Sequence, residues 1–562
     1  MEVHVGPQGP RANGAWMSYE DASLSVYVAG RVDINGHVSK GGSWRDIPEI
    51  IAGACRTVGV RGLVGGLNGQ FALVLIEDHV VHVVADHCAV VPLYWTLTGG
   101  PGCFCFAAGT VLSDLCQRMS GAGRDVVPDI FSLTRYILTG STCASGRVNR
   151  TLVQGIFNVG PASGATIDLR DGRVDGWQYW TPSEKSRRDR SAAAGVDAIK
   201  TALKESLRTA AAYGRVGVEL SSGMDSGVIA ASLAEMGQAD AACFAIKYPR
   251  TEVDESRWAT ATAERLGLTC DVVDVADRPV TTWNPQSVFA AGIPGDLYVA
   301  QQAGAVAAAR VRQVRTLLTG VGADELFGLS GGPGYIWDLV VRGQLVTAAR
   351  HGWSWAKKRA SRSPDEVERL IIPPWVSRDL VAPISDEWHR ARRVRGRMWA
   401  VRIAYAVNAE VMWSNWGPIY EPAGIALYHP YLTRDVIEAA MATPGCWLDN
   451  PAEYKWLLRQ LAHGHFGWVK FAEEQDDLST FTMDGILCAR SALHGMFSTV
   501  ANCELATLGV VNGSVVDYMA AYLRDPLTFY TELWDELYGV SLHALRTIEA
   551  ELWLRGLRMA FP

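Results

Sequence analysis

The chain has 562 residues, too many for one hydrophobic core, so two large domains are expected. Apolar residues make up 48% of it and charged residues 20%, as in ordinary globular proteins, and a formal charge of −7 argues against general attraction to nucleic acid or an anionic membrane. No apolar run approaches the roughly 20 residues of a transmembrane helix, the start of the chain lacks a signal-peptide layout, and the 11 cysteines follow no disulfide-framework spacing. The sequence therefore predicts a cytoplasmic protein with reduced cysteines.

The chain up to about residue 180 is predicted to be rich in β-strands. Residues 24–32, 70–77 and 79–86 are runs of apolar or β-branched side chains with Gly, Asn and Asp at or near their ends. Only Asp78 separates the last two runs, which predicts a tight hairpin. Residues 50–60 fit a short amphipathic helix between strands.

A change of composition marks the predicted end of the first domain. Residues 182–191 are charged and contain Pro and Ser, as solvated linkers do. We therefore predict one domain over residues 1–185 and another over residues 192–562. The second is predicted to begin with a helix over residues 193–213, which ends before Gly214.

The next stretch is the one around which the chain is organised. An apolar strand at residues 216–220 leads into the small residues Ser221, Ser222 and Gly223, and a helix is predicted to start at Asp225 or Ser226. Such a turn directs backbone N–H groups at one point before the positive end of a helix, which suits a phosphate group. Asp225 adds a carboxylate able to hold Mg²⁺ on that phosphate. The alternative is a Ser/Gly turn that binds nothing.

Strands and helices alternate after this turn. Residues 241–246 and 269–275 are predicted strands, and residues 252–266 and 299–312 are predicted helices. This alternation indicates a doubly wound parallel sheet, whose ligands lie at the carboxyl ends of the strands. The phosphate turn is predicted to lie at such an end.

A second apolar strand, at residues 315–318, ends in a similar turn. It continues as Thr319-Gly320-Val321-Gly322, and Asp324 and Glu325 follow. Carboxylates at adjacent strand ends suit an oxygen-seeking ion that bridges phosphates. The alternative is an acidic pair at the start of a helix. From residue 335 the chain is predicted to be rich in helices.

These motifs resemble those of the N-type ATP pyrophosphatases, the group that includes asparagine synthetases. Ser221, Gly223, Asp225 and Ser226 match the S-G-G-x-D-S loop, while Ser222 replaces a Gly, a departure that matters only if this position needs positive φ. Residues 319–325 resemble the second signature, T/S-G-x-G-A/S-D-E. Residues 428–433 resemble the H-P-F-L-D segment, with Thr433 in place of its Asp, and residues 453–459 match the K-x-x-L-R helix that carries Lys455.

The resemblance implies a site for ATP and Mg²⁺. Adenine would lie near Leu220 and Ile246, and Asp225 and Asp324 would share the Mg²⁺. The triphosphate would lie across Ser221, Ser222, Gly223, Ser226 and the turn with Thr319, Gly320 and Gly322. A substrate carboxylate would attack the α-phosphorus, and an amine would then attack the acyl-adenylate to give an amide and AMP. Lys455 would offset the charge that develops on the carbonyl oxygen.

The attacking amine must be neutral, so a base or a lowered amine pKa is required. Glu410 and Glu421 are candidate orienting carboxylates for this step. The alternative, which the sequence favours at both positions, is an ordinary acidic residue of a helix or loop.

The first domain resembles the glutamine-hydrolysing domain of class II amidotransferases, an αββα sandwich of the N-terminal-nucleophile type. Residues 67–72, 85–87, 92–95 and 106–109 carry the resemblance. That family uses a cysteine exposed by removal of Met, but Glu2 stands there and the first cysteine is Cys55. We therefore expect an α/β protein: a degenerate, glutaminase-inactive sandwich, then a doubly wound ATP pyrophosphatase domain with a helical extension.

Two branches of the family use an amine already present on the substrate, namely the β-lactam synthetases and the macrolactam synthetases that close the ring of lasso peptides. In β-lactam synthetases a tyrosine that serves in cyclisation occupies the x of T-G-x-G, where this chain has Val321. The Trp-rich C-terminal part also suits a large peptide. The chain is therefore most similar to a lasso-peptide cyclase, which joins a peptide's N-terminal amine to an internal Asp or Glu side chain.

Such an enzyme would act on a precursor peptide, with a leader peptidase and a leader-recognition protein as partners and neither nucleic acid nor membrane among them. One alternative is a ligase for a small amino acid, like a β-lactam or asparagine synthetase. A second is a scaffold that has lost the chemistry, against which the intact Asp225, Asp324 and Lys455 argue.

Overall fold

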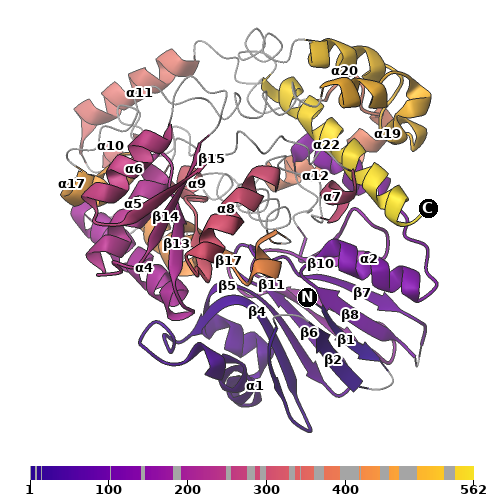
Figure 1. Ribbon diagram of the computed structural model, residues 1–562, viewed down its shortest axis with the longest axis horizontal. Coiled ribbons are helices and arrows are strands. Elements are labelled where there is room, and N and C mark those ends of the chain that lie inside the picture. Colours follow the sequence, from indigo (N-terminus) through magenta and orange to yellow (C-terminus); the bar gives the residue numbers. More distant parts are fainter. Residues whose placement is uncertain are drawn as a thin grey trace.

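The computed structural model describes the chain apart from residues 1, 7–8, 14–15, 102, 141–145, 182–190, 248–254, 275–284, 291–298, 328–335, 342, 360–371, 393–416, 418, 444–454, 467–489 and 525–537. The described part contains two antiparallel six-stranded sheets and one parallel five-stranded sheet. Figure 1 shows the antiparallel sheets at the lower right and the parallel sheet at the left.

The two antiparallel sheets lie face to face. One has the order β2-β1-β8-β7-β10-β9 and the other β12-β11-β6-β5-β4-β3. Their bounds are β1 (Glu2–Gly6), β2 (Gly9–Asn13), β3 (Met17–Glu20), β4 (Ser25–Ile34), β5 (Leu67–Glu77), β6 (Val80–Ala85), β7 (Tyr94–Thr98), β8 (Cys105–Gly109), β9 (Val148–Arg150), β10 (Ile156–Val159), β11 (Ser163–Asp168) and β12 (Val174–Gln178). Val83 and Ala165 from one sheet pack against Trp95 and Phe106 from the other, which fills the space between them.

Helices cover both outer faces of this pair. Helix α1 (Ile47–Leu63) packs on the sheet with β4 and β5, and helices α2 (Leu112–Gly121) and α3 (Ile130–Thr139) border the sheet with β7 and β8. The predicted αββα sandwich is therefore confirmed. The predicted hairpin of β5 and β6 is present as well, with Asp78 at φ 51° in the left-handed conformation of a tight turn.

The parallel sheet has the order β15-β14-β13-β16-β17. Its strands are β13 (Val216–Glu219), β14 (Ala242–Lys247), β15 (Thr269–Asp274), β16 (Thr316–Leu318) and β17 (Ala426–Tyr428). Along the chain the strands progress outward in one direction from β13 and then in the other from β16. The predicted doubly wound sheet is therefore confirmed, and its switch point lies between β13 and β16.

Helices line both faces of the parallel sheet. On one face α4 (Ala192–Ala212), α5 (Met224–Glu235) and α6 (Glu255–Arg265) cover Val216 and Val218 of β13. On the other face α8 (Val299–Val311) packs with Leu317 of β16 against side chains of the first domain. The remaining helices of the described part that precede residue 467 are α7 (Pro285–Ala290), α9 (Ala323–Phe327), α10 (Ile336–Val341), α11 (Leu345–Arg359), α12 (Val381–Arg392), α15 (Arg434–Met441) and α17 (Trp456–Phe466), with the 3₁₀ helices η1 (Trp44–Asp46), η2 (Val64–Gly66), η4 (Arg378–Leu380), η6 (Glu421–Ala423) and η7 (Pro430–Leu432).

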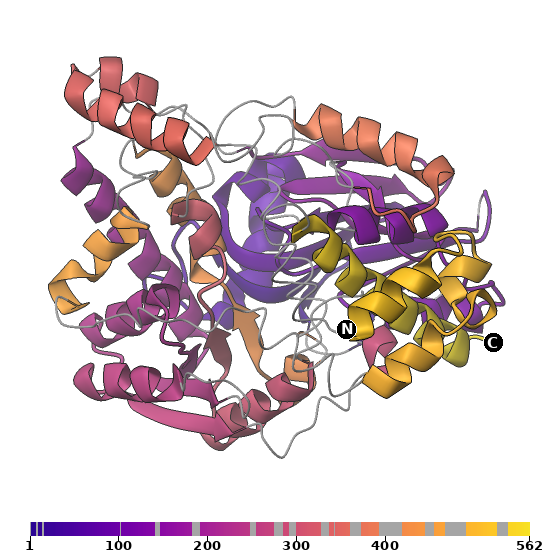
Figure 2. The same ribbon diagram turned by 90° about the horizontal axis from the view of Figure 1, so that it is seen from above.

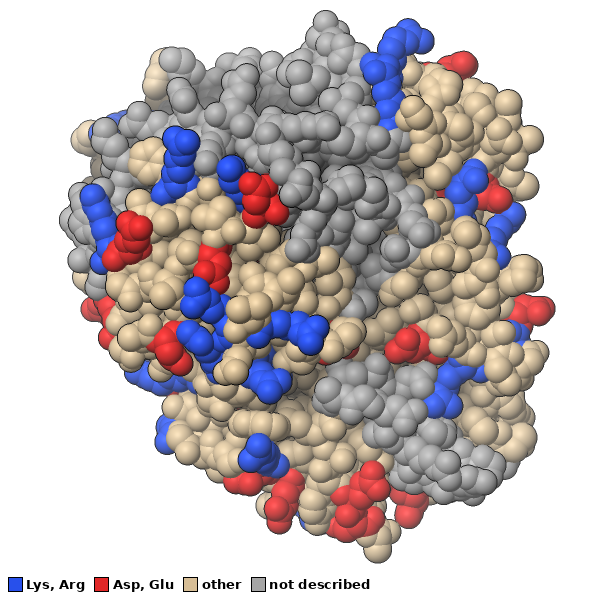
Figure 3. All heavy atoms as spheres, in the orientation of Figure 1, with Lys and Arg blue, Asp and Glu red and all other residues tan. Residues whose placement is uncertain are grey.

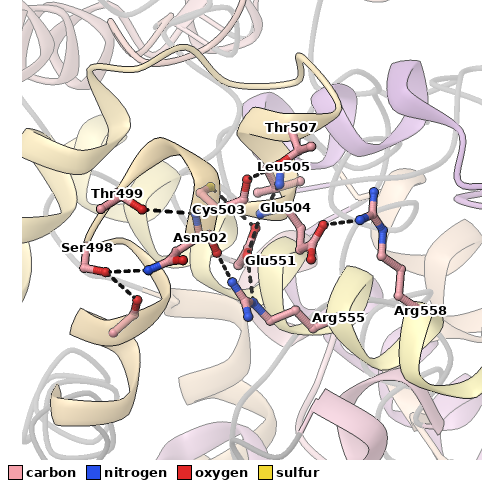
Figure 4. A network of polar contacts seen from close by, with 11 residues as sticks. Ser498, Thr499, Asn502, Cys503, Glu504, Leu505, Thr507, Glu551, Arg555 and Arg558 are labelled. Atoms are coloured by element: carbon pink, nitrogen blue, oxygen red, sulfur yellow. Dashed lines mark hydrogen bonds and ion pairs between the residues drawn. The ribbon is translucent and has the colours of Figure 1, made fainter. Parts of the chain in front are cut away.

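The C-terminal helices pack on the first domain, as Figures 1 and 2 both show. They are η8 (Val500–Asn502), α19 (Glu504–Thr507), α20 (Val515–Arg524) and α22 (Tyr538–Ala560), and they share a core with α2 and α3. Glu551 of α22, fully buried, accepts the backbone N–H groups of Glu504 and Leu505 at 2.9 Å and so caps α19 (Figure 4). The predicted boundary between residues 185 and 192 stays a prediction, since residues 182–190 lie outside the described residues.

Within the described ranges, none of the helices combines the length and apolar character that crossing a bilayer requires.

A buried acid between α3 and α22 predicts a pH-dependent stability. Glu549 accepts a hydrogen bond from the Tyr136 hydroxyl at 2.7 Å, and burial raises the pKa of Glu549 to about 7, against the smaller opposing effects of Tyr136 and Arg546. From pH 4.5, its ordinary pKa, to about pH 7, the unfolded chain loses this proton while the folded chain keeps it. The contribution of Glu549 to the free energy of unfolding should therefore fall by about 3 kcal/mol as the pH rises through this interval, and stay level outside it.

Glu549→Gln keeps the acceptor for Tyr136 but cannot ionise. We expect this variant to be more stable than the wild type at pH 8 and to lose the extra pH dependence between pH 4.5 and 7. Urea unfolding at a series of pH values measures both effects. Glu205→Gln, at a partly exposed site on α4, serves as the control. Equal pH slopes for wild type and Glu549→Gln would contradict the prediction.

Candidate active site

The loop after β13 is held in place by its own serines. The Ser221 N–H donates to Ser226 Oγ at 3.1 Å, and the Gly223 N–H donates to Ser221 Oγ at 3.0 Å. Helix α5 begins at Met224, one or two residues earlier than predicted, with Gly223 as its N-cap. Asp225 therefore lies in the first turn, at the positive end of the helix dipole.

Ser222 fits this loop without strain. It is not among the non-glycine residues with positive φ, so its departure from the family's Gly costs no backbone energy. Its Oγ is buried and has no hydrogen-bond partner within the described residues. A buried hydroxyl without a protein partner is a donor that a phosphate oxygen can satisfy.

The loop after β16 touches the loop after β13. A Cβ atom on Gly320 would lie 2.9 Å from Asp225 Cβ and 3.0 Å from the Ser226 nitrogen, so only glycine allows this approach. Gly322 has φ 95°, a conformation that favours glycine. The structure thus brings together the two loops that the sequence predicts for ATP, at the carboxyl ends of β13 and β16.

A lysine lies between the two predicted metal-binding carboxylates. Lys455 Nζ is 2.7 Å from both carboxylate oxygens of Asp225 and 2.7 Å from Asp324 Oδ1. The lysine side chain is 7% exposed, that of Asp225 22% and that of Asp324 64%, so the group opens toward solvent on the Asp324 side. These three predicted residues, from distant parts of the sequence, form one charged cluster.

Opposing influences set the pKa values in this cluster. Burial alone would lower the pKa of Lys455, but the two carboxylates outweigh it and raise that pKa, so the lysine is a cation at neutral pH. Burial raises the pKa of Asp225, and the charge of Asp324 adds to this while Lys455 opposes it. Two acids around one base leave an excess of negative charge that attracts a further cation.

Lys455 differs from its prediction in one respect. It was predicted within a helix, but α17 begins at Trp456, and Lys455 precedes it with φ 52°. The left-handed conformation is unfavourable for a residue with a side chain. Strain of this kind persists where surrounding structure imposes it, which is common at functional sites.

Asp225 and Asp324 suit Mg²⁺ by their chemistry. Both offer hard oxygen ligands, and both already face one cation, the Lys455 ammonium group. The described ranges contain no cluster of three or more His, Cys, Asp or Glu side chains that could hold a metal ion. Two carboxylates fit the way Mg²⁺ is commonly held, with few protein ligands and phosphate oxygens completing its shell.

Two contacts behind the loops were missed by sequence reasoning. The Tyr431 hydroxyl donates to the Asp225 carbonyl oxygen at 2.9 Å, and His429 Nδ1 lies 2.6 Å from Thr319 Oγ1. Thr319 Oγ1 also accepts the Val321 N–H at 3.3 Å, and burial lowers the pKa of His429 to about 3, so its ring is neutral. The only sequence signal was the resemblance of residues 428–433 to a family segment, which assigned these side chains no partners.

The predicted adenine contacts lie on neighbouring strands. The Leu220 N–H donates to the Phe244 carbonyl at 2.9 Å, while the Leu220 side chain is buried in the core beside α5. Ile246, near the end of β14, is half-buried. Their contact with adenine stays a prediction.

The predicted orienting acids are only partly placed. Glu410 lies outside the described residues. Glu421 begins η6, which precedes β17 at the amino end of that strand, whereas the two loops lie at the carboxyl ends of β13 and β16; burial raises the pKa of Glu421 to about 7. A third acid, Glu219 at the end of β13, was not predicted; burial raises its pKa, and Gln302 Nε2 donates to it at 3.4 Å. The signal for it was a charged residue that closes an apolar strand directly before the phosphate loop.

Two arginines lie at the amino ends of parallel strands, opposite the two loops. Arg215 and Arg315 precede β13 and β16, and Arg215 Nη1 donates to the Arg312 carbonyl at 2.9 Å. Figure 3 shows Lys and Arg side chains gathered on the face where the parallel sheet borders the first domain. This contact to a backbone carbonyl gives Arg215 a structural role away from the loops.

Comparison with known proteins supports the synthetase domain. Residues 198–466 match the model of the asparagine synthase family, and this range contains both loops and Lys455. The match supports an asparagine synthetase-like domain and, in general terms, an ATP-dependent ligase that forms carbon–nitrogen bonds. A comparison with curated proteins gave no match.

Solved structures show only a distant likeness. Glutamine phosphoribosylpyrophosphate amidotransferase from B. subtilis, complexed with ADP and GMP, is 10% identical with a TM-score of 0.19 over 47% of this chain and 48% of that one. An allosteric regulatory enzyme of purine biosynthesis is also 10% identical, with a TM-score of 0.20 over 47% of this chain and 62% of that one. The chain thus spans 48% and 62% of the lengths of these two structures, and the likeness carries no argument about function.

Proposed function

We propose that this protein is a macrolactam synthetase. It adenylates an Asp or Glu side-chain carboxylate of a precursor peptide with ATP and closes a ring with the peptide's N-terminal amine, as in lasso-peptide biosynthesis. The observation that carries the proposal is Lys455 Nζ, held 2.7 Å from Asp225 and from Asp324 where the two loops meet. The family match over residues 198–466 supports the ligase chemistry in general.

The first step forms a mixed anhydride. The substrate carboxylate oxygen attacks the α-phosphorus of ATP, the bond between the α-phosphorus and its bridging oxygen breaks, and pyrophosphate leaves. Ser222 Oγ, the backbone N–H groups of the first turn of α5 and the turn after Thr319 bind the phosphates. Mg²⁺ held by Asp225 and Asp324 would supply charge stabilisation to the pyrophosphate.

The second step forms the amide. The peptide's amine nitrogen attacks the acyl carbon, gives up a proton and displaces AMP. Lys455 is placed to stabilise the charge that develops on the carbonyl oxygen. Glu410, Glu421 and Glu219 are the candidates to accept the proton; of these, Glu219 closes β13 directly before the phosphate loop, and burial raises its pKa.

Two features favour a peptide over a small amino acid. Val321, in the loop after β16, packs against the hydrophobic core and cannot act as a tyrosine does in β-lactam synthetases. The thiol of Cys55, the first cysteine, is buried beside Glu77, and burial raises its pKa to about 11, so it is a poor nucleophile for releasing ammonia from glutamine. An amine already on the substrate fits both. A leader peptidase and a leader-recognition protein would then be partners.

Exchange of labelled pyrophosphate into ATP tests the proposal. A core peptide with a free N-terminal amine and an internal Asp or Glu should stimulate exchange and yield a product lighter by one water. The same peptide with the internal acid changed to Asn or Gln should do neither. Exchange with aspartate or a β-amino acid but with no peptide would point to a ligase of small amino acids. ATP binding without exchange for any substrate would point to a scaffold.

A further inference from the structure

The motif Asn68-Gly69-Gln70, which helps to carry the resemblance to glutamine-hydrolysing domains, makes contacts with the other domain. Gln70 lies on β5 and is buried. Its Oε1 accepts the His429 N–H at 2.9 Å and its Nε2 donates to the His429 carbonyl oxygen at 2.7 Å. One amide side chain thus satisfies both backbone groups of a residue 359 positions away.

His429 also contacts the turn after β16, residues 319–322, which we call the nucleotide loop. His429 directly follows β17, and its ring lies 2.6 Å from Thr319 Oγ1, which accepts the Val321 N–H. The Thr319 N–H itself donates to the Tyr428 carbonyl at 3.2 Å. A continuous line of hydrogen bonds therefore runs from Gln70 through His429 to the turn that is predicted to hold the triphosphate.

A second residue of the first domain contacts the opposite end of the same parallel sheet. Arg31 on β4 donates from Nη2 to the Arg315 carbonyl at 2.9 Å and from Nε to Thr316 Oγ1 at 3.0 Å. Arg31 and Gln70 are direct cross-strand partners in the β4–β5 pair, so their side chains leave the same face of the sheet. Together they hold β16 at its start and the turn after β17 at its end. We call this pair the interdomain clamp.

Two glycines make the clamp possible. Gly30 precedes Arg31 with φ 98°, and Gly69 precedes Gln70 with φ 104°. A Cβ atom on Gly30 would collide with the Gln70 carbonyl oxygen, and one on Gly69 with that of Arg31. Both positions need glycine because the two strands approach closely where the clamp residues project.

We propose that the first domain serves the ligase as a rigid support for the nucleotide loop, and that Gln70 is its positioning residue, acting through His429 on Thr319. This inference rests on the proposed use of ATP at that loop. It gives the αββα domain a role that requires no catalytic nucleophile, since side-chain amide and backbone contacts carry it.

Gln70→Met removes both hydrogen bonds at similar size, and Gln70→Glu keeps the acceptor but sets a carboxylate oxygen against the His429 carbonyl. Both should raise the KM for ATP about tenfold and change kcat less than about twofold, because the loop is displaced while Lys455 stays. Tyr213→Phe is the matched control. The Tyr213 hydroxyl bridges the same two domains by donating to the Val32 carbonyl and accepting the Val32 N–H. Phe removes these two bonds but keeps the ring that packs under the Arg31 guanidinium, so the clamp itself stays intact.

A double-mutant cycle separates positioning from general loosening. Thr319→Val removes the hydroxyl that His429 contacts, so after this change Gln70→Met should have little further effect on the KM for ATP. Additive effects of the two substitutions would overturn the proposal. So would an equal rise in KM for Tyr213→Phe.

Amide hydrogen exchange tests, without ATP, whether the clamp stabilises the nucleotide loop. Gln70→Met should speed exchange in residues 316–327, and Tyr213→Phe should not. If the wild type binds no ATP, the proposed function fails, yet faster exchange confined to this segment still supports the clamp. Unchanged exchange there, in either Gln70 variant that melts within a few degrees of the wild type, contradicts it.

Discussion

Lys455→Ala is expected to lower the rate of amide formation about 10²- to 10³-fold while the fold survives. A preorganised cation that faces developing negative charge typically stabilises the transition state by a few kcal/mol. A water molecule in its place would first have to reorient, so it would stabilise that charge less. Lys455 is 7% exposed and is oriented by two carboxylates at 2.7 Å, so its position is fixed before substrate arrives. The variant should retain more pyrophosphate exchange than amide formation, because Lys455 is assigned mainly to the second step, the attack of the amine on the acyl-adenylate.

Stability gives this variant a second signature. Without the ammonium group, Asp225 stays buried beside Asp324 with no opposing charge, so the pKa of Asp225 should rise further. A folded pKa above the unfolded value costs stability as the pH rises, so the deficit relative to wild type should be larger at pH 8 than at pH 4. Lys200→Ala is the matched control, because Lys200 pairs with Glu235 at the far end of α5. Unchanged turnover in Lys455→Ala would remove the lysine from the site.

Local sequence patterns predicted the framework well. The strands at β13, β14 and β16, and the helices α4 and α8, lie within about one residue or two of their predictions, because each is a periodic apolar segment bounded by Gly or by charged residues. The same alternation of strands and helices predicted a parallel doubly wound sheet, because few other sheet topologies are compatible with it. Such a sheet has a switch point, which lies here between β13 and β16. This order alone places the Asp225 and Asp324 loops side by side.

Local sequence patterns could not predict the contacts between distant segments. Nothing in the sequence near Gln70 indicates that its amide will pair with the backbone of His429, and nothing near Tyr431 indicates a bond to the Asp225 carbonyl. The left-handed conformation of Lys455 was equally hidden, because a K-x-x-L-R pattern fits a helix throughout. These features depend on how the two domains pack against each other. Such packing leaves no pattern among neighbouring residues of one sequence, so it cannot be predicted from local signals.

Asp225→Asn is expected to abolish pyrophosphate exchange, with a loss of at least about a hundredfold, without lowering stability. The amide keeps the shape of the first turn of α5 but removes a charged oxygen ligand for Mg²⁺. Burial raises the pKa of Asp225, which means that its ionised form is disfavoured in the folded protein. Lys455 retains Asp324 as a partner, so the neutral side chain should leave the melting temperature at pH 7 unchanged or higher.

Exchange measured across a range of Mg²⁺ concentrations, beside thermal melts, tests both halves of this prediction. Wild-type exchange should disappear when the metal is chelated and return when Mg²⁺ is restored, whereas the variant should stay inactive at Mg²⁺ levels that saturate the wild type. Glu235→Gln, which also removes one carboxylate from α5 but in its last turn, should keep full exchange. Wild-type exchange in Asp225→Asn would refute the assignment of this carboxylate. A large fall in its melting temperature would instead show that the ion pair with Lys455 holds the two loops together.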